Sequence, residues 1–149
     1  MSIGAITVPV YPSNTEEQVH YILDHSQSKF VFAEDQEQLD KMMKIRSGLS
    51  DVQQTVVFDK YQPEIIEKVI SLDAFREKGS TFRRGNPEML KKSIDGGNPQ
   101  DTISFIYTSG TTGHPKAGLI NSENVLAVVK HLPDLYGICL LYTSDAADE

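Results

Sequence analysis

The sequence predicts an α/β fold with a mostly parallel sheet flanked by helices. Short apolar runs typical of buried strands alternate with segments whose apolar residues recur every three or four positions, as on one face of a helix. The composition agrees, because 39% apolar and 23% charged residues among 149 are ordinary for a soluble domain with a core. We therefore expect one α/β unit.

The first expected strand and helix lie near the N-terminus. The apolar run at residues 3–10 is interpreted as a helix end that leads into a buried strand, stopped by the prolines at positions 9 and 12. Residues 13–16, Ser-Asn-Thr-Glu, fit the capping-box pattern. The apolar residues after it recur at helical spacing: Val19, Ile22 and Leu23.

A second strand and helix are expected directly afterwards. Residues 30–33, Phe-Val-Phe-Ala, are a candidate for a short buried strand. Asp35 is suited to begin a helix, because its carboxylate can accept from backbone N–H groups of the first turn. The apolar face of that helix is expected to contain Leu39, Met42 and Met43 in the core.

The middle of the chain predicts less regular structure. Residues 55–58 are a strand candidate, and four apolar residues suggest a third helical face: Ile65, Ile66, Val69 and Ile70. Residues 79–99 turn polar and contain helix-breaking glycines, with room for a short helix over 87–93 capped by Asn86. A strand over 102–107 and a helix from Asn121 complete the predicted order.

Charge and reactive residues narrow the class of function. A net charge of −7 disfavours a nucleic-acid surface, and no apolar run approaches the roughly 18 residues of a membrane helix. The single cysteine excludes an internal disulfide and a cysteine zinc site, which favours a reducing, cytoplasmic setting. The four histidines show no metal-binding spacing, and His20 and His25 are expected to be solvated.

Residues 105–116, FIYTSGTTGHPK, have the composition of an anion-binding loop. Four hydroxyl side chains follow the expected strand: Thr108, Ser109, Thr111 and Thr112. Gly110 and Gly113 allow positive φ and close approach of the backbone to a ligand, and successive N–H groups in such a turn can bind an anion. Lys116 supplies a compact positive charge. The set suits a polyphosphate.

This segment differs from a Walker A loop, in which lysine directly follows the second glycine. Here His114 and Pro115 stand between Gly113 and Lys116, and Ala117 follows the lysine. A polar surface loop rich in turn formers is the alternative that these residues leave open.

Residues 107–116 resemble the phosphate-binding signature of the adenylate-forming superfamily, which includes acyl-coenzyme A synthetases, luciferases and adenylation domains of peptide synthetases. Asp101 and Asn124 match the same pattern. Residues 4–35, GAITVPVYPSNTEEQVHYILDHSQSKFVFAED, resemble long-chain fatty-acid synthetases in particular. The resemblance covers most of residues 1–138 and implies part of the N-terminal large domain of that fold.

The resemblance implies a reaction in two steps. A carboxylate attacks the α-phosphate of ATP to give an acyl-adenylate and pyrophosphate, and coenzyme A then displaces AMP to form a thioester. Residues 108–113 would hold the β- and γ-phosphates, and Lys116 would help to neutralise them. Mg²⁺ would accompany ATP, although the sequence identifies no ligand for it. Small molecules are thus the expected partners, and peripheral association with a membrane is compatible with the full-length enzyme.

The chain departs from the family pattern in three respects. Ser122 stands where the family has a histidine, which puts a contact near the acyl group in question. The later motifs, including the catalytic lysine, lie outside this chain, so its catalytic residues are unknown and residues 1–138 are expected to be an inactive fragment truncated at both ends. Residues 139–149, CLLYTSDAADE, resemble translated sequencing adapter and are expected to be a non-native tail.

Two other functions remain open from the sequence. A different adenylate-forming enzyme, such as a peptide-synthetase adenylation domain, would share the loop. A non-catalytic nucleotide-binding module of this length would fold and bind ATP without further domains.

Overall fold

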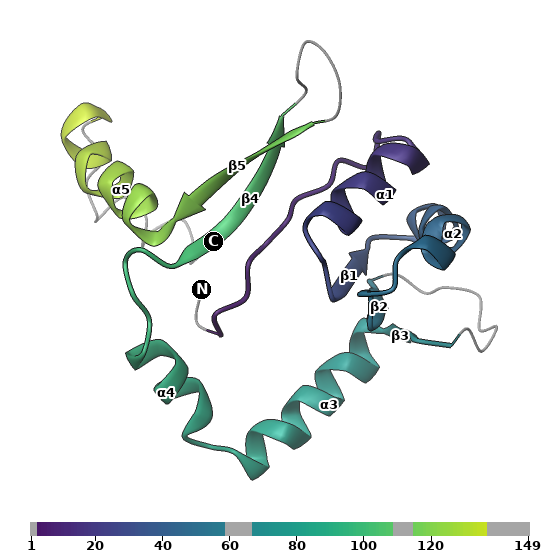
Figure 1. The fold of residues 1–149 in the computed structure, drawn as a ribbon. Coiled ribbons are helices and arrows are strands. Elements are labelled where there is room, and N and C mark those ends of the chain that lie inside the picture. The colour runs from purple at the N-terminus through teal and green to yellow at the C-terminus, as the bar shows by residue number, and fades with distance from the viewer. Residues whose placement is uncertain (1–2, 59–66, 109–114, 137–149) are drawn as a thin grey trace, which may run out of the picture.

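The computed structural model describes residues 3–58, 67–108 and 115–136, with only the backbone described for 133–136. Figure 1 shows a parallel sheet with its helices, joined through two successive helices to a two-stranded hairpin. The elements in order are α1 (Glu16–His25), β1 (Phe30–Ala33), α2 (Gln36–Ile45), the 3-10 turn η1 (Arg46–Gly48), β2 (Gln54–Val57), β3 (Val69–Ser71), α3 (Leu72–Gly85), α4 (Met89–Asp95), β4 (Thr102–Thr108), β5 (Lys116–Asn121) and α5 (Ser122–Tyr136).

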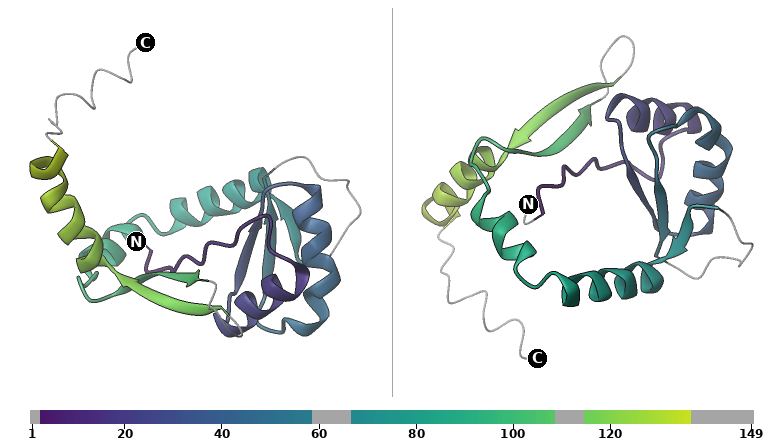
Figure 2. Two further views of the ribbon diagram at one scale, coloured as in Figure 1. Left: turned by 90° about the horizontal axis from the view of Figure 1, so that it is seen from above. Right: turned by 60° about the horizontal axis from the view of Figure 1, so that its bottom comes forward.

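The parallel sheet has the strand order β1-β2-β3 and carries helices on both faces. Leu39 of α2 is fully buried against Ala33, Val57 and Val69 of the three strands. Side chains alternate along a strand, so Phe30 and Phe32 of β1 lie on the opposite face from Ala33, where their rings contact Phe75 of α3. The predicted α/β fold with a parallel sheet is confirmed (Figure 2).

Helix α2 and the apolar face of α1 match their sequence patterns. The side chain of Asp35 accepts from the backbone N–H of Gln38 at 2.9 Å and begins α2 as expected. A second cluster joins the two helices to the turn after them: Leu23, Met42, Leu49 and Val52, with Val19, Val31 and Ile45 against it. Both methionines of α2 are thus core residues, as predicted.

The capping box of α1 lies two residues later than predicted. Thr15 is the N-cap: its hydroxyl accepts from the Gln18 N–H at 3.3 Å, and the Gln18 side chain accepts from the Thr15 N–H at 3.0 Å. Glu16 is therefore the first helical residue, and its carboxylate pairs with Lys44 of α2 at 2.7 Å. The predicted box from Ser13 to Glu16 is wrong because Thr-x-x-Gln fits the same motif.

Replacing Thr15 with alanine is expected to lower the free energy of unfolding by about 1 kcal/mol, because the Gln18 N–H in the first turn loses the hydroxyl that accepts from it. Ser13→Ala is the matched control and should change it by less than about 0.5 kcal/mol. Urea unfolding followed by circular dichroism measures both. A loss for Ser13→Ala as large as that for Thr15→Ala would contradict the assignment of Thr15 as the N-cap.

The N-terminal segment is extended and exposed, so the prediction of a buried strand over residues 3–10 is wrong. Ile3 is 69% exposed and Ile6 is 44% exposed. Thr7 alone forms a parallel bridge to β4, in which its N–H donates to Ile103 O at 2.9 Å and its carbonyl accepts from the Phe105 N–H at 3.0 Å. No described helix covers this segment, so it lies along β4 at the surface.

The helical face predicted over residues 65–70 is also wrong where the structure describes it. Val69 and Ile70 belong to β3, paired with Thr55 and Val56 of β2, while Ile65 and Ile66 lie outside the described residues. Apolar residues that are one position apart fit a strand and a helix equally well. The pairing with β2 decides between them here, because it satisfies the backbone hydrogen bonds of a β-branched segment.

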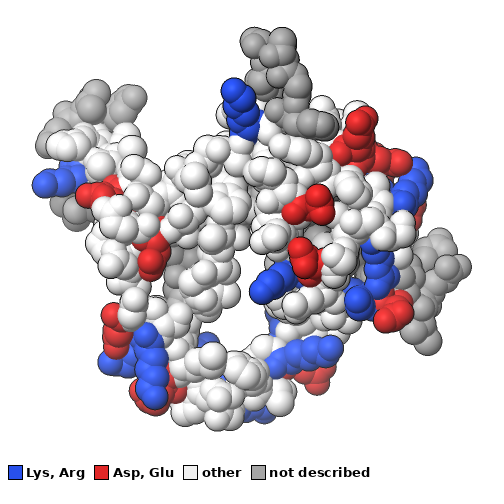
Figure 3. Space-filling view, in the orientation of Figure 1, with Lys and Arg blue, Asp and Glu red and all other residues white. Residues whose placement is uncertain are grey.

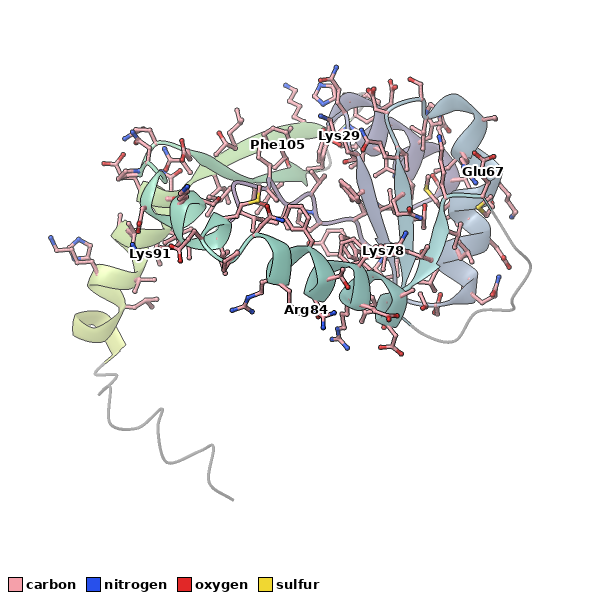
Figure 4. All side chains as sticks on the ribbon, turned by 90° about the horizontal axis from the view of Figure 1, so that it is seen from below. Lys29, Glu67, Lys78, Arg84, Lys91 and Phe105 are labelled. Carbon is pink, nitrogen blue, oxygen red and sulfur yellow. The ribbon has the colours of Figure 1, made fainter. Side chains whose placement is uncertain are left out.

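Helix α3 continues through a segment that the sequence predicted to be largely irregular. Ser71 caps it by accepting from the Ala74 N–H at 3.2 Å, and Gly79 lies inside the helix. Asn86 ends α3, since its side chain donates to Phe82 O at 2.9 Å, and it does not cap α4 as predicted. Neither α3 nor α4 contains a buried residue. Figure 4 shows Lys78 and Arg84 on α3 and Lys91 on α4.

The C-terminal part consists of the antiparallel hairpin β4–β5 and helix α5. Strand β4 and helix α5 were predicted, whereas β5 was not. Figure 3 shows that the charged side chains of this view lie mostly around its periphery and that the face is hollowed in the middle. Large apolar side chains remain exposed on this part of the chain: Leu119, Val125, Leu126, Val128 and Val129.

Candidate functional site

The candidate loop joins the two strands of the hairpin. Thr108 ends β4 and Lys116 begins β5, and the two residues are paired directly across the hairpin. Directly opposed side chains lie on the same face, with Cβ atoms about 4.5–5.5 Å apart. The structure therefore brings together the first and last of the predicted phosphate-binding residues. The others lie outside the described residues: Ser109, Gly110, Thr111, Thr112 and Gly113.

The end of the hairpin offers a hydroxyl and an ammonium group to solvent. Thr108 and Lys116 are both exposed, and none of the ion pairs among the described residues involves Lys116. An exposed ammonium with no carboxylate partner can donate to phosphate oxygens without first breaking an ion pair. This arrangement suits the binding of a polyanion.

The opposite end of the hairpin is closed by hydrogen bonds of Asp101 and Asn124, the two residues that match the resembled pattern, and of Asn121. Asp101 accepts from the Asn98 N–H at 2.8 Å, and its carbonyl accepts from the Ser122 N–H at 3.1 Å. Asn121 and Asn124 exchange side-chain-to-backbone hydrogen bonds at 3.0 and 2.8 Å at the start of α5. In this structure Asp101 and Asn124 thus fix the turn into β4 and the beginning of α5.

Three aromatic side chains meet beside the loop end of the hairpin. His25 Nδ1 and Tyr107 Oη are 2.7 Å apart. Tyr21 stacks on His25 with ring centroids 5.4 Å apart, and Tyr107 meets both rings edge-on at 6.4 and 5.8 Å. His25 is exposed, as expected of a solvated histidine, but its hydrogen bond was not predicted. The partners are 82 positions apart, so no local spacing indicates it.

Tyr107 is expected to ionise at a higher pH than an ordinary tyrosine. Burial first, and the nearby Tyr21 second, raise the pKa of its phenol above 10.0, because both disfavour the phenolate. The stabilisation of the fold by neutral Tyr107 is thus present below pH 10 and is lost as the pH rises through the raised pKa. Carbon NMR of labelled tyrosine rings, with the Tyr107 signal assigned from Tyr107→Phe, measures this pKa. A titration midpoint of Tyr107 at or below pH 10.0 would contradict the expected increase.

The described residues show neither a cluster of metal ligands nor a membrane-spanning helix. They contain no group of three or more histidine, cysteine, aspartate or glutamate side chains that could hold a metal ion. Within the same residues, every helix is too short or too polar to cross a lipid bilayer.

Comparison with known proteins assigns the class. The chain belongs to the AMP-binding enzyme family, whose sequence pattern matches residues 1–143. The resemblance inferred from the loop is thereby confirmed.

Among its curated relatives are two long-chain-fatty-acid–CoA ligases. ACSBG2 of Xenopus laevis is 27% identical and ACSBG1 of Homo sapiens is 28% identical, each over 122 residues. Those residues are 82% of this chain and 16% of the relatives, so the chain spans about a sixth of their length.

The fold is similar to that of solved adenylate-forming enzymes. The anthranilate CoA ligase AuaEII, crystallised with anthranoyl-AMP, matches with a TM-score of 0.63 and 20% identity. The match covers 87% of this chain and 22% of that one. It supports the fold assigned above.

Proposed function

We propose that residues 1–138 belong to the N-terminal domain of an ATP-dependent, AMP-forming acyl-coenzyme A synthetase that activates a long-chain fatty acid. The observation that carries the proposal is the pairing of Thr108 with Lys116 at the end of the hairpin, on either side of a glycine- and hydroxyl-rich sequence. The family membership supports the use of a nucleotide, and the curated relatives support the fatty-acid substrate.

In the proposed reaction a fatty-acid carboxylate attacks the α-phosphate of ATP, and the bond to the β-phosphate breaks. Acyl-adenylate and pyrophosphate result; the thiol of coenzyme A then forms the thioester and releases AMP. Residues 108–113 would bind the β- and γ-phosphates, and Lys116 would offset their charge. Such donors accelerate the reaction by stabilising the charge that develops on the leaving pyrophosphate. Mg²⁺ would enter with ATP.

Two further features complete the proposal. The exposed apolar side chains of α4 and α5 suit surfaces that pack against more of the same domain, since isolated soluble domains seldom leave such areas uncovered.

Residues 139–149 are proposed to be a non-native tail, which sequencing of the gene across codon 139 would test. The longer enzyme is proposed to be cytoplasmic, and peripheral association with membranes is compatible with it.

The test compares the 149-residue chain with the enzyme that its gene encodes. The longer enzyme is expected to form AMP and an acyl thioester from ATP, coenzyme A and palmitate, and to be much less active with acetate or an amino acid. The 149-residue chain is expected to show no turnover. Thioester formation by the 149-residue chain alone would refute its proposed status as a fragment, and activity only with an amino acid would refute the fatty-acid substrate.

A further inference from the structure

We propose that His25 and Tyr107 form an anchor that fixes the loop end of the β4–β5 hairpin against α1. Both are positioning residues: neither is proposed to touch the nucleotide. The consequence for ATP rests on the proposed function, because it assumes that the loop between Thr108 and Lys116 binds the triphosphate.

The anchor joins two elements that are far apart in the sequence. His25 is the last residue of α1, directly before the turn into the parallel sheet, and Tyr107 is the penultimate residue of β4. Their hydrogen bond of 2.7 Å is supported by the ring of Tyr21, which contacts both side chains. Figures 1 and 2 show α1 beside the end of the hairpin where β4 ends and β5 begins.

The position of Tyr107 allows it to hold the hairpin without obstructing the candidate site. Tyr107 is paired with Ala117, one step along the ladder from the Thr108–Lys116 pair. Neighbouring pairs point to opposite faces of a strand, so the anchor and the candidate phosphate ligands lie on opposite faces. The hydrogen bond therefore restrains the rotation of the strand end about its axis and leaves the face of Thr108 and Lys116 open.

The hairpin needs such a restraint because two strands alone are marginally stable in water. Its first strand is held further back by the hydrogen bonds of Thr7 to Ile103 and Phe105, at 2.9 and 3.0 Å. The bond from His25 supplies a second point of attachment next to the loop. A phenol hydroxyl can donate or accept, so the bond forms with either tautomer of the imidazole.

The test removes each partner separately and together. Tyr107→Phe deletes the hydroxyl, and His25→Leu deletes the imidazole; Tyr11→Phe and His131→Leu are matched controls at exposed positions. Amide hydrogen exchange of the 149-residue chain without ligand is the primary readout. Faster exchange is expected at residues 105–108 and 116–119 in both anchor variants and in neither control, with exchange in the parallel sheet unchanged.

Affinities for MgATP, inorganic tripolyphosphate and AMP are measured on the same variants. Each anchor variant should bind the first two about 5-fold more weakly, as expected for one lost hydrogen bond, and AMP equally well. The double variant should bind no more weakly than the weaker single one, because the two side chains act as one unit. An equal loss for AMP, or additive losses, would overturn the positioning role.

The two proposals fail in different ways. If the wild-type chain binds neither MgATP nor tripolyphosphate, the proposed function and the effect of the anchor on nucleotide binding are both refuted. Hydrogen exchange then remains the test of the anchor itself. Exchange at the hairpin end that is the same in the anchor variants and in the controls would overturn the anchor, whatever the affinities.

Discussion

Replacing Lys116 with alanine is expected to weaken MgATP binding about 10- to 100-fold, the effect of losing a charged hydrogen-bond donor to phosphate. Lys116 is exposed opposite Thr108 at the end of the hairpin, and no ion pair among the described residues competes for it. Isothermal titration with MgATP measures the change. AMP affinity should fall much less, because the ammonium is proposed to contact the β- and γ-phosphates.

Lys78→Ala is the matched control, since it removes the same charge from the exposed surface of α3. Its effect on MgATP affinity should be less than about 2-fold, because an exposed charge away from the site is screened by salt. Equal losses for the two variants would mean that the chain attracts ATP by its general charge and that Lys116 has no particular place in the site.

Leu39→Ala is expected to lower the free energy of unfolding by about 2–5 kcal/mol. Leu39 is 0% exposed and joins α2 to all three strands of the parallel sheet through Ala33, Val57 and Val69. Truncation removes the buried methyl groups and leaves a cavity that this small core can fill only in part. Because small domains are stable by only about 5–15 kcal/mol, the loss would be a large fraction of the total.

Urea unfolding of the variant and of Leu126→Ala provides the measurement and its control. Leu126 lies on α5 and is 60% exposed, so its truncation should change the unfolding free energy by less than about 0.5 kcal/mol. A change at Leu39 as small as that at Leu126 would contradict the placement of α2 on the sheet.

The elements that the sequence predicted correctly are those whose local pattern is compatible with only one type of secondary structure. Asp35 followed by Leu39, Met42 and Met43 specifies a cap and one helical face, and α2 has both. Val69 and Ile70 fit a helix and a strand equally well, and only the pairing with β2, which depends on distant residues, makes them a strand. For α3, Gly79 weakened the helical pattern of the sequence, yet the helix begins at the Ser71 cap and continues through Gly79.

In the candidate site, too, some features can be predicted from the sequence and others depend on the tertiary structure. Its residue types and their order are visible in FIYTSGTTGHPK, because hydroxyls, glycines and a lysine after a strand have a chemical meaning without tertiary structure. Strand β5 and the pairing of Thr108 with Lys116 are set by hydrogen bonds across the hairpin. The contact of His25 with Tyr107 depends on how α1 lies beside that hairpin, which no short stretch of sequence encodes.

The most direct test of the phosphate-binding site is an NMR titration of the ¹⁵N-labelled 149-residue chain with MgATP, repeated with Lys116→Ala. We expect saturable shifts of the amide resonances of Thr108, Lys116 and the non-proline residues between them, and a much weaker response in the variant. Shifts confined to other parts of the chain, or an unchanged titration in Lys116→Ala, would contradict it.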